Sequence, residues 1–291
     1  MHTRLTPDNP HGYNRYGFAW QNVPPGGTTH LDFGCSDGMF LATLRSKEIA
    51  RLVGVDISRE AVRKAGERFP DMQIMHISKM VPLPFRNGEF TSVTVLDVIE
   101  HVGNQLALLR ELNRVLKDDG TLIVTVPGQH LFSFLDMGNL KFCFPRLHRW
   151  YYCRKHSEAE YEYRYVSNPD GLIGDISAQK RWHEHFSQAK LEKLLNSCGF
   201  TIIGFDGTGL FSRVIKNIGF LFGWFKPLQY LVEKVGALDA KFFESANLFC
   251  VARKQQKSNT KRDLEASREL TENAQTRTAC QNTDEDNKGY G

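Results

Sequence analysis

The order of apolar and amphipathic segments between residues 29 and 127 is the feature that most limits how this chain can fold. Short apolar runs of strand length alternate there with segments whose apolar residues recur at helical spacing. This alternation is typical of βαβ units built around a parallel sheet. We therefore predict strands at 29–33, 52–56, 72–77, 90–97 and 121–126, with helices at 38–46, 58–69 and 104–116 between them.

The rest of the chain departs from this regular pattern. Residues 1–28 are polar with scattered aromatic residues and end in Pro-Pro-Gly-Gly, so we interpret them as a leader that ends in a turn. The main domain is expected at 29–253. Two insertions are expected within it, a basic and aromatic one at about 128–182 and an apolar one at about 208–240. Residues 254–291 are polar with few apolar anchors and are expected to be disordered.

Regular structure is predicted to return after the first insertion. Ser187 is placed to cap a helix that ends before Gly199, and strands follow at 200–205 and 246–252. The expected fold class is α/β. It consists of a Rossmann-like, doubly wound, mostly parallel sheet whose last strand is antiparallel, with an insertion after the fifth strand.

Composition narrows the function without identifying it. A net charge of +4 over 291 residues does not favour a chain-wide nucleic-acid binder. The six cysteines form no C-x-x-C pair and no zinc-type spacing with histidine, so no metal site is expected and a reducing, cytoplasmic setting is favoured. The sequence contains no uncharged apolar run long enough to predict a membrane span, and we recognise no secretory signal in it.

A glycine-rich turn follows the first predicted strand. Residues 30–38 read H-L-D-F-G-C-S-D-G, and glycines at 34 and 38 let a chain turn sharply from strand to helix and approach a ligand closely. Asp56 ends the second strand, 22 positions after Gly34, where a carboxylate can accept hydrogen bonds from ribose hydroxyls. The sequence therefore predicts a nucleoside-containing ligand.

The charges of this turn bear on which nucleoside it binds. A dinucleotide site favours glycine where this chain has Ser36 and Met39, and it places a pyrophosphate over the helix N-terminus. Asp32 and Asp37 would flank and repel that anion. S-adenosylmethionine (SAM) carries a sulfonium and an ammonium instead of phosphate, so the charge pattern favours SAM over a nicotinamide dinucleotide.

Four ordered motifs resemble class I SAM-dependent methyltransferases, in particular their small-molecule, methyltransferase type 11-like branch. The similarity is close over 29–127 and looser over 185–187 and 194–205. The motifs are D-F-G-C-S-D-G at 32–38, V-G-V-D-I-S at 53–58, L-P-F at 83–85 with L-D-V-I-E-H-V at 96–102, and L-N-R-V-L-K-D-D-G-T-L at 112–122.

The resemblance implies a role for each matching residue. Asp32 would serve the methionine ammonium, Asp56 the ribose diol, Ile57 the adenine, and Asp97 the methionine moiety beside the transferable methyl. The turn residues that would line the methionine and ribose are Gly34, Ser36 and Gly38.

Two departures from the family pattern concern this site. Ser36 stands where the family has a middle glycine. The stretch 77–80, shortly before Leu83, reads I-S-K-M and lacks the acidic residue that the family often has there, so Ser78 or backbone would have to contact the adenine amine. Each aspartate also has an alternative role: Asp56 could cap the next helix, and Asp97 could be a structural acid.

For a hydroxyl acceptor a general base would help, and such a base contributes about 10²–10⁴-fold to the rate. His101 follows the fourth strand and is the first candidate, and His185 is the second, with His183 beside it. Packing, capping or solvated structural roles are the alternatives for these histidines.

The predicted function is transfer of a methyl group to a small-molecule acceptor. Amphiphilic, lipid-linked and glycan-linked acceptors stay open because of the two insertions. The Phe-rich segment 210–226 is either a lid or core-packing helix, or an interfacial helix that contacts membrane or a lipid-like acceptor. The alternatives are an RNA methyltransferase and a non-catalytic SAM-fold binding protein. A cytoplasmic location, with peripheral membrane association as an alternative, is expected, and no oligomeric state is predicted.

Overall fold

The fold was obtained as a computed structural model, which describes residues 9–11, 14–129, 144–167, 184–209, 211, 226–242 and 247–256. The chain divides into one compact unit, Met1–Gln255, and a second unit that begins at Gln256. Nearly all of the predicted tail 254–291 lies outside the described residues. Its first residue, Lys254, still belongs to the last strand.

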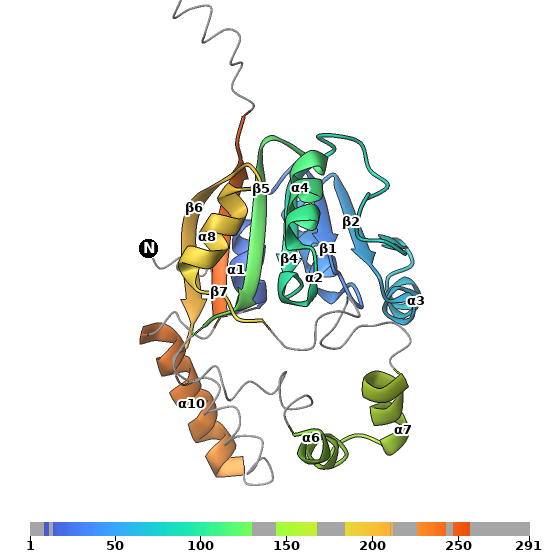
Figure 1. Ribbon diagram of the computed structural model, residues 1–291, viewed down its shortest axis with the longest axis vertical. Coiled ribbons are helices and arrows are strands. Elements are labelled where there is room, and N and C mark those ends of the chain that lie inside the picture. The colour runs from blue at the N-terminus through green and yellow to red at the C-terminus, as the bar shows by residue number, and fades with distance from the viewer. Residues whose placement is uncertain are drawn as a thin grey trace, which may run out of the picture. The chain divides into compact units, whose positions relative to one another are not determined.

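A seven-stranded sheet forms the centre of the first unit, with the order β3-β2-β1-β4-β5-β7-β6 (Figure 1). β7 pairs antiparallel with β5 and with β6, and the other pairs are parallel. This arrangement confirms the predicted α/β class with an antiparallel last strand. The strands are β1 (Thr29–Phe33), β2 (Arg51–Asp56), β3 (Gln73–His76), β4 (Phe90–Leu96), β5 (Leu116–Pro127), β6 (Phe200–Thr208) and β7 (Asn247–Lys254).

Helices connect the strands where the apolar periodicity predicts them. Ser58, Asn104 and Ser187 each accept a backbone N–H of the first helical turn and so begin α3, α4 and α8. The helices of the sheet region are α1 (Arg15–Asn22), α2 (Met39–Thr43), η1 (Leu44–Lys47), α3 (Arg59–Arg68), η2 (Ile99–His101), α4 (Gln105–Val115) and α8 (Gln188–Asn196).

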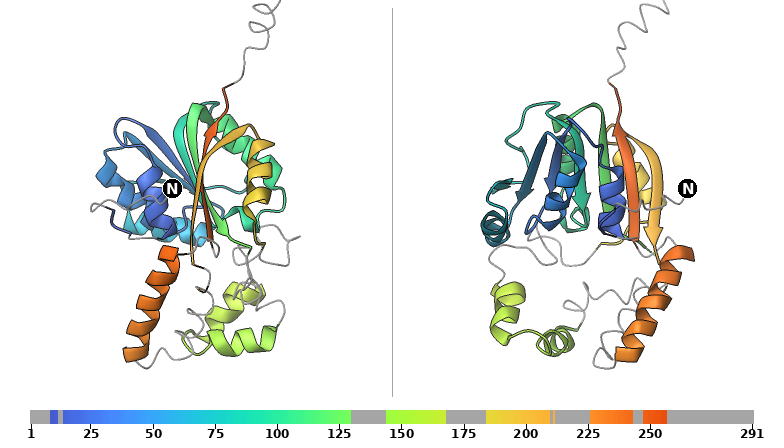
Figure 2. Two further views of the ribbon diagram at one scale, coloured as in Figure 1. Left: turned by 90° about the vertical axis from the view of Figure 1, so that its left-hand side faces the viewer. Right: turned by 180° about the vertical axis from the view of Figure 1, so that it is seen from behind.

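Two apolar cores lie on opposite faces of the sheet (Figure 2). One joins Leu31 and Phe33 of β1 to the apolar stripes of α4 and α8. The other joins the buried faces of α1 and α2 to Ile123 of β5 and Phe249 of β7. Because both faces are covered, the central strands are buried along most of their length, as expected for parallel strands.

The N-terminal segment differs from the expected leader. Residues 15–22 form α1, which Asn14 caps by accepting the N–H groups of Tyr16 and Gly17. Its buried side chains include Phe18 and Trp20, which belong to the second core. Phe18 and Trp20, which looked scattered in the sequence, therefore lie on the inner face of a short helix.

The described part of the first predicted insertion contains α6 (Pro145–Tyr152), α7 (Glu158–Tyr161) and the π-helical segment η4 (Glu162–Ser167). Within the second predicted insertion the described helix is α10 (Lys226–Phe242). The Phe-rich prediction at 210–226 falls almost entirely outside the described residues. Among the helices that are described, none is long and apolar enough to cross a membrane.

Candidate cofactor and active site

The glycine turn after β1 is held in a conformation that a side chain would disturb. Gly34 and Gly38 have φ of 80° and 76°. A Cβ at Gly34 would collide with Val98 Cγ2, and one at Gly38 would lie 2.7 Å from Ile74 Cδ1. Ser36, the departure from the middle glycine, adopts the left-handed φ of 48° that glycine would take without strain. The turn therefore keeps its shape despite the substitution.

Asp56 ties this turn to the end of β2. Its Oδ2 accepts the Ser36 N–H at 2.8 Å and its Oδ1 accepts the Ser58 N–H at 2.8 Å. Burial raises the pKa of the Asp56 carboxyl, although the N–H groups of Ser58 and Ser36 oppose this shift. The side chain that caps α3 is that of Ser58, and Asp56 does not act as the helix cap. Each carboxylate oxygen keeps a second lone pair that can accept from a ligand.

Asp32 lies on β1 beside the turn and is only 3% exposed. Its Oδ1 accepts the Thr94 hydroxyl at 2.7 Å. Burial raises the pKa of Asp32 to about 7; the Thr94 bond lowers it and the Asp56 charge raises it further. Two buried carboxylates so close together suit a cationic ligand and would repel a diphosphate.

Asp97 follows β4 and is one of four non-glycine residues with positive φ among those described, at 53°. Its Oδ1 accepts the Thr125 hydroxyl at 2.7 Å, and its N–H is donated to the Thr125 carbonyl at 2.9 Å. Backbone strain of this kind costs about 1–3 kcal/mol and clusters at functional sites. The strained backbone places the Asp97 carboxylate at the same end of the sheet as Asp32 and Asp56.

Arg15 is the site residue that sequence reasoning missed. Its guanidinium, from α1, forms an ion pair with Asp97 Oδ2 and donates to the Tyr16 hydroxyl at 2.9 Å. Burial lowers the pKa of Arg15, but the Asp97 carboxylate and the Tyr16 hydroxyl outweigh this and raise it overall. No local signal marks Arg15, because its partner lies 82 positions away in the sequence.

Ile57 and Ser78 lie where the resemblance expects adenine contacts. Ile57 is half-buried against the first core, and its carbonyl lies 3.1 Å from His76 Nε2 at the end of β3. Ser78 is exposed two residues beyond β3. Both therefore follow strands at the cofactor end of the sheet, and their adenine roles stay predictions.

The two candidate bases lie in segments that one side chain connects. His101 ends η2, with its Nε2 3.9 Å from the buried Glu100 carboxylate. His185 precedes Phe186, which pairs with Gly128 just after β5. Gln105 Nε2 donates both to the Ile99 carbonyl in η2 and to Glu184 Oε2, at 3.1 and 2.7 Å. The structure thus brings both segments to the carboxyl ends of β4 and β5, whereas His183 lies outside the described residues.

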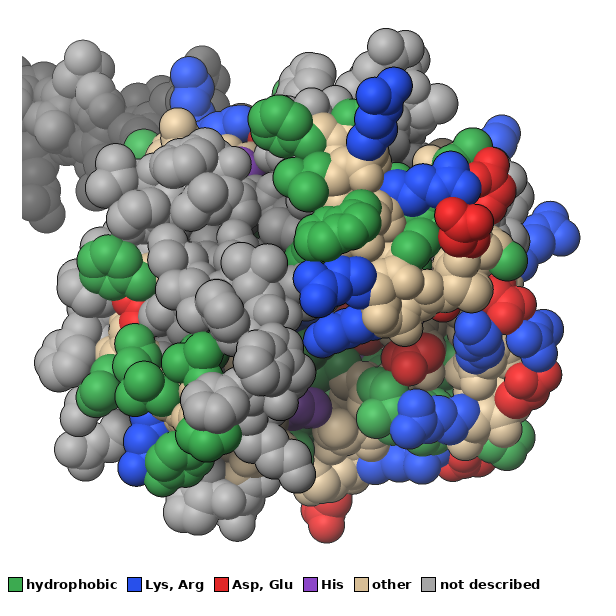
Figure 3. Space-filling view, turned by 90° about the horizontal axis from the view of Figure 1, so that it is seen from below, with side chains coloured by type: hydrophobic (Ala, Val, Ile, Leu, Met, Phe, Trp, Pro, Cys, Tyr) green, Lys and Arg blue, Asp and Glu red, His purple; other side chains and the backbone are tan. Residues whose placement is uncertain are grey.

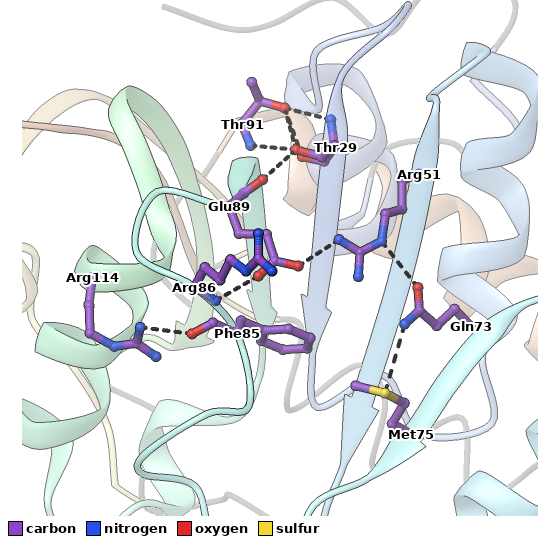
Figure 4. Close-up of polar contacts among 9 residues, drawn as sticks. All are labelled: Thr29, Arg51, Gln73, Met75, Phe85, Arg86, Glu89, Thr91 and Arg114. Atoms are coloured by element: carbon purple, nitrogen blue, oxygen red, sulfur yellow. Dashed lines mark hydrogen bonds and ion pairs between the residues drawn. The ribbon is translucent and has the colours of Figure 1, made fainter.

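The Leu83–Phe85 loop is held by a charged pair on α4, Glu111 and Arg114, and Figure 4 shows the contact between Arg114 and Phe85. Glu111 accepts the Leu83 N–H at 2.6 Å, and Arg114 donates to the Phe85 carbonyl at 2.8 Å. A hollow beside this loop includes Arg51 and Glu89, which pair at 2.6 Å. Since Arg51 begins β2 and Glu89 precedes β4, the hollow lies at the amino ends of the strands, away from the glycine turn. It is not the cofactor site.

Several known proteins of similar sequence are named as methyltransferases. The family model described as "Methyltransferase domain" matches residues 6–204. A Mycobacterium tuberculosis protein named "Probable S-adenosylmethionine-dependent methyltransferase" is 29% identical over 123 residues, which are 42% of this chain and 44% of that protein. A demethylmenaquinone methyltransferase of Staphylococcus saprophyticus is 28% identical over 184 residues, 60% of this chain and 71% of that protein. The chain thus spans less than half the length of the first of these relatives.

Solved structures agree on the fold. A chain from a complex between the Haloferax volcanii Trm112 methyltransferase activator and a methyltransferase superposes with a TM-score of 0.53 at 20% identity, covering 83% of this chain and 88% of that one. The [4+2]-cyclase SpnF superposes with a TM-score of 0.50 at 15% identity, covering 82% and 79%. One fold therefore carries more than one reaction. The family match settles the assignment: the chain belongs to the methyltransferase-domain family, in agreement with the resemblance of its motifs, and its fold is that of the solved structures named above.

Proposed function

We propose that this chain transfers a methyl group from SAM to a small-molecule acceptor at the carboxyl ends of β1, β2 and β4. The observation that carries this proposal is the placement of three carboxylates, Asp32, Asp56 and Asp97, at or next to the ends of strands that are neighbours in the sheet. Ligands of open α/β sheets bind outside the carboxyl ends of the strands, at the point where the strand order reverses. That point lies between β1 and β4 here.

The residues fit a SAM molecule by their chemistry. When bound, SAM supplies a methyl carbon that is activated by a positively charged sulfur. Asp32 would bind the ammonium group, Asp56 would accept hydrogen bonds from the ribose hydroxyls, and Asp97 would lie beside the methionine moiety. The side-chain-free backbone at Gly34 and Gly38 would allow close approach. Holding the reactants in alignment can lower the barrier by about 7–11 kcal/mol.

A hydroxyl acceptor would lose its proton to a histidine. His101 is the first candidate because η2 follows the β4 end directly, and His185 is the second because it follows the β5 end through the Gly128 bridge. His101→Gln should lower kcat about 10²–10⁴-fold at unchanged SAM affinity. If His101→Gln has the same kcat as wild type, then either His185 is the general base or the acceptor needs no general base.

We further propose an amphiphilic acceptor. On α6, Leu147 and Trp150 are 50% and 55% exposed beside the exposed Arg146 and Arg154. On α10, four exposed apolar side chains recur on one face of the helix: Tyr230, Leu231, Val235 and Leu238. Figure 3 shows hydrophobic and basic side chains next to each other on one face of the molecule. Exposed apolar groups mixed with basic ones favour an acceptor that has an apolar body and an anionic group, or an acceptor that is surrounded by lipids of that kind.

Isothermal titration tests the cofactor part of this proposal. SAM and S-adenosylhomocysteine should bind the folded protein, and Asp71→Asn, an exposed aspartate paired with Arg45 away from the site, should bind SAM as well as wild type does. A folded protein that binds neither compound would exclude the proposed activity.

The acceptor class is tested by label transfer. Purified protein is incubated with methyl-tritiated SAM and separate lipid, polar-metabolite and RNA fractions of a cell extract. Label in the lipid fraction supports an amphiphilic acceptor, and label confined to RNA would replace it with the nucleic-acid alternative. A protein that binds SAM and labels no fraction would favour the non-catalytic alternative.

A further inference from the structure

A fully buried histidine lies two residues before Asp32 on the same strand. His30 is 0% exposed, and both of its ring nitrogens contact hydroxyl groups of the neighbouring strand β4. Nδ1 lies 2.8 Å from Ser92 Oγ and Nε2 lies 3.0 Å from Thr94 Oγ1. Thr94 in turn donates to Asp32 Oδ1 at 2.7 Å. The four side chains form one continuous hydrogen-bonded row.

Strand pairing builds this row. In the parallel register, His30 is opposite Ser92 and Asp32 is opposite Thr94. Alternate residues of a strand point to the same face, so His30 and Asp32 lie on one face of β1 and their partners lie on the same face of β4. All four side chains are at most 3% exposed, so water has little access to them.

The donors and acceptors of the row determine one another. An ionised Asp32 only accepts, and Thr94 has one hydroxyl hydrogen, which it donates to Asp32. Thr94 Oγ1 must then accept from His30, so the proton of the neutral imidazole is on Nε2. Nδ1 is left to accept the Ser92 hydroxyl. Burial, with the nearby Lys47 charge, lowers the pKa of His30 to about 3, so the ring stays neutral at physiological pH.

We propose that His30 is a positioning residue that acts through Thr94 to hold the Asp32 carboxylate in its ionised, cation-binding state. A donor aimed at Thr94 Oγ1 polarises the hydroxyl and strengthens its bond to Asp32, since chains of hydrogen bonds reinforce one another in a low dielectric. This inference rests on the proposed ammonium-binding role of Asp32. If Asp32 became protonated on Oδ1 and donated to Thr94, the whole row would reverse and the imidazole proton would move to Nδ1.

The state of the imidazole can be observed without any ligand. Long-range ¹H–¹⁵N correlation on histidine-labelled, ligand-free protein at pH 8 should show His30 as the neutral Nε2–H tautomer, and His30→Gln identifies its signal by its loss. A neutral Nδ1–H tautomer or an imidazolium at that pH would overturn the proposal. Because this readout needs no SAM, it separates the row from the proposed activity.

A double-mutant cycle measures the coupling. His30→Leu should weaken SAM binding about three- to tenfold at pH 8, and His30→Gln, which keeps an amide N–H donor for Thr94, should restore most of it. In a Thr94→Val background, which lacks the hydroxyl, His30→Leu should have no further effect. An equal loss in both backgrounds would mean that His30 acts only through general packing. If SAM binds neither wild type nor variants while the Nε2–H tautomer is observed, the proposed function fails but the row stands.

Discussion

Replacing Asp56 by Asn tests the ribose assignment with a change of one atom. In the structure both carboxylate oxygens accept a backbone N–H, from Ser36 and from Ser58, at 2.8 Å each. An amide offers one acceptor oxygen, and its NH₂ group would face one of those N–H donors. The variant therefore loses the charge that a ribose diol would contact, and it leaves either the Ser36 N–H or the buried Ser58 N–H without its acceptor.

The size of the effect follows from these contacts. A hydrogen bond to a charged group contributes about 1.5–3 kcal/mol, and loss of one such ribose bond would weaken SAM binding about 10- to 150-fold. A buried N–H left without an acceptor costs about 1–3 kcal/mol of the free energy of unfolding. Both the affinity for SAM and the stability of the ligand-free protein should fall.

Isothermal titration with SAM and urea denaturation measure the two quantities on the same preparations. Asp71→Asn is the matched control, because Asp71 is 70% exposed and pairs only with Arg45 among the described residues. It should change neither quantity by more than about 0.5 kcal/mol, as is usual for surface positions. If folded Asp56→Asn binds SAM within twofold of wild type, our ribose assignment is wrong.

Four further predictions concern Asp32, Arg114 and Arg15. Burial raises the pKa of Asp32 to about 7, above its unfolded value of about 3.9, so the contribution of Asp32 to the stability of the ligand-free protein should fall as the pH rises from about 4 to 7. In thermal melting, Asp32→Asn should therefore gain stability relative to wild type over this pH range. SAM affinity should rise over pH 6–8 as Asp32 ionises, and a flat titration profile would contradict this. Arg114→Met removes the bonds that hold the Leu83–Phe85 loop and should cost about 1–3 kcal/mol in urea denaturation, whereas Arg45→Met at an exposed pair should cost less than about 1. Arg15→Gln should lower kcat/KM for the acceptor at least fivefold. It should destabilise the protein by less than about 1 kcal/mol, because the ion pair of Arg15 is partly exposed. An unchanged kcat/KM would show that Arg15 does not belong to the site.

Much of this fold could be predicted because its determinants are local. The apolar periodicity of 29–127, the caps at Ser58 and Ser187, and the left-handed Gly199 each act within a few residues of the chain. The glycine turn and the carboxylate that ends β2 are local in the same sense, since each belongs to one strand and the loop after it. A reader of the sequence can therefore predict the element order, the cofactor turn and its negative charge.

Boundaries that depend on neighbours were less well predicted. The dipeptide Asp119-Gly120 is typical of a turn and directly precedes the predicted strand 121–126. It nevertheless lies inside β5, which begins at Leu116, directly after α4. Asp119 still takes a positive φ of 60°, so the local signal was correct, but Leu116 pairs with Phe90 of β4, and a register shift before Thr121 accommodates the residues between them within the strand. Tertiary hydrogen bonding outweighed the turn preference.

The tertiary structure alone decided which polar groups meet. Arg15 reaches Asp97 only because the aromatic face of α1 packs on the sheet, and His30 meets Thr94 only because β1 and β4 pair in one register. Both contacts join residues more than 60 positions apart. Sequence periodicity reports which side of an element is buried, but a long-range polar contact depends on the register and packing of two elements together. The sequence thus determined where charge lies along the chain, and the fold determined which partner each charge has.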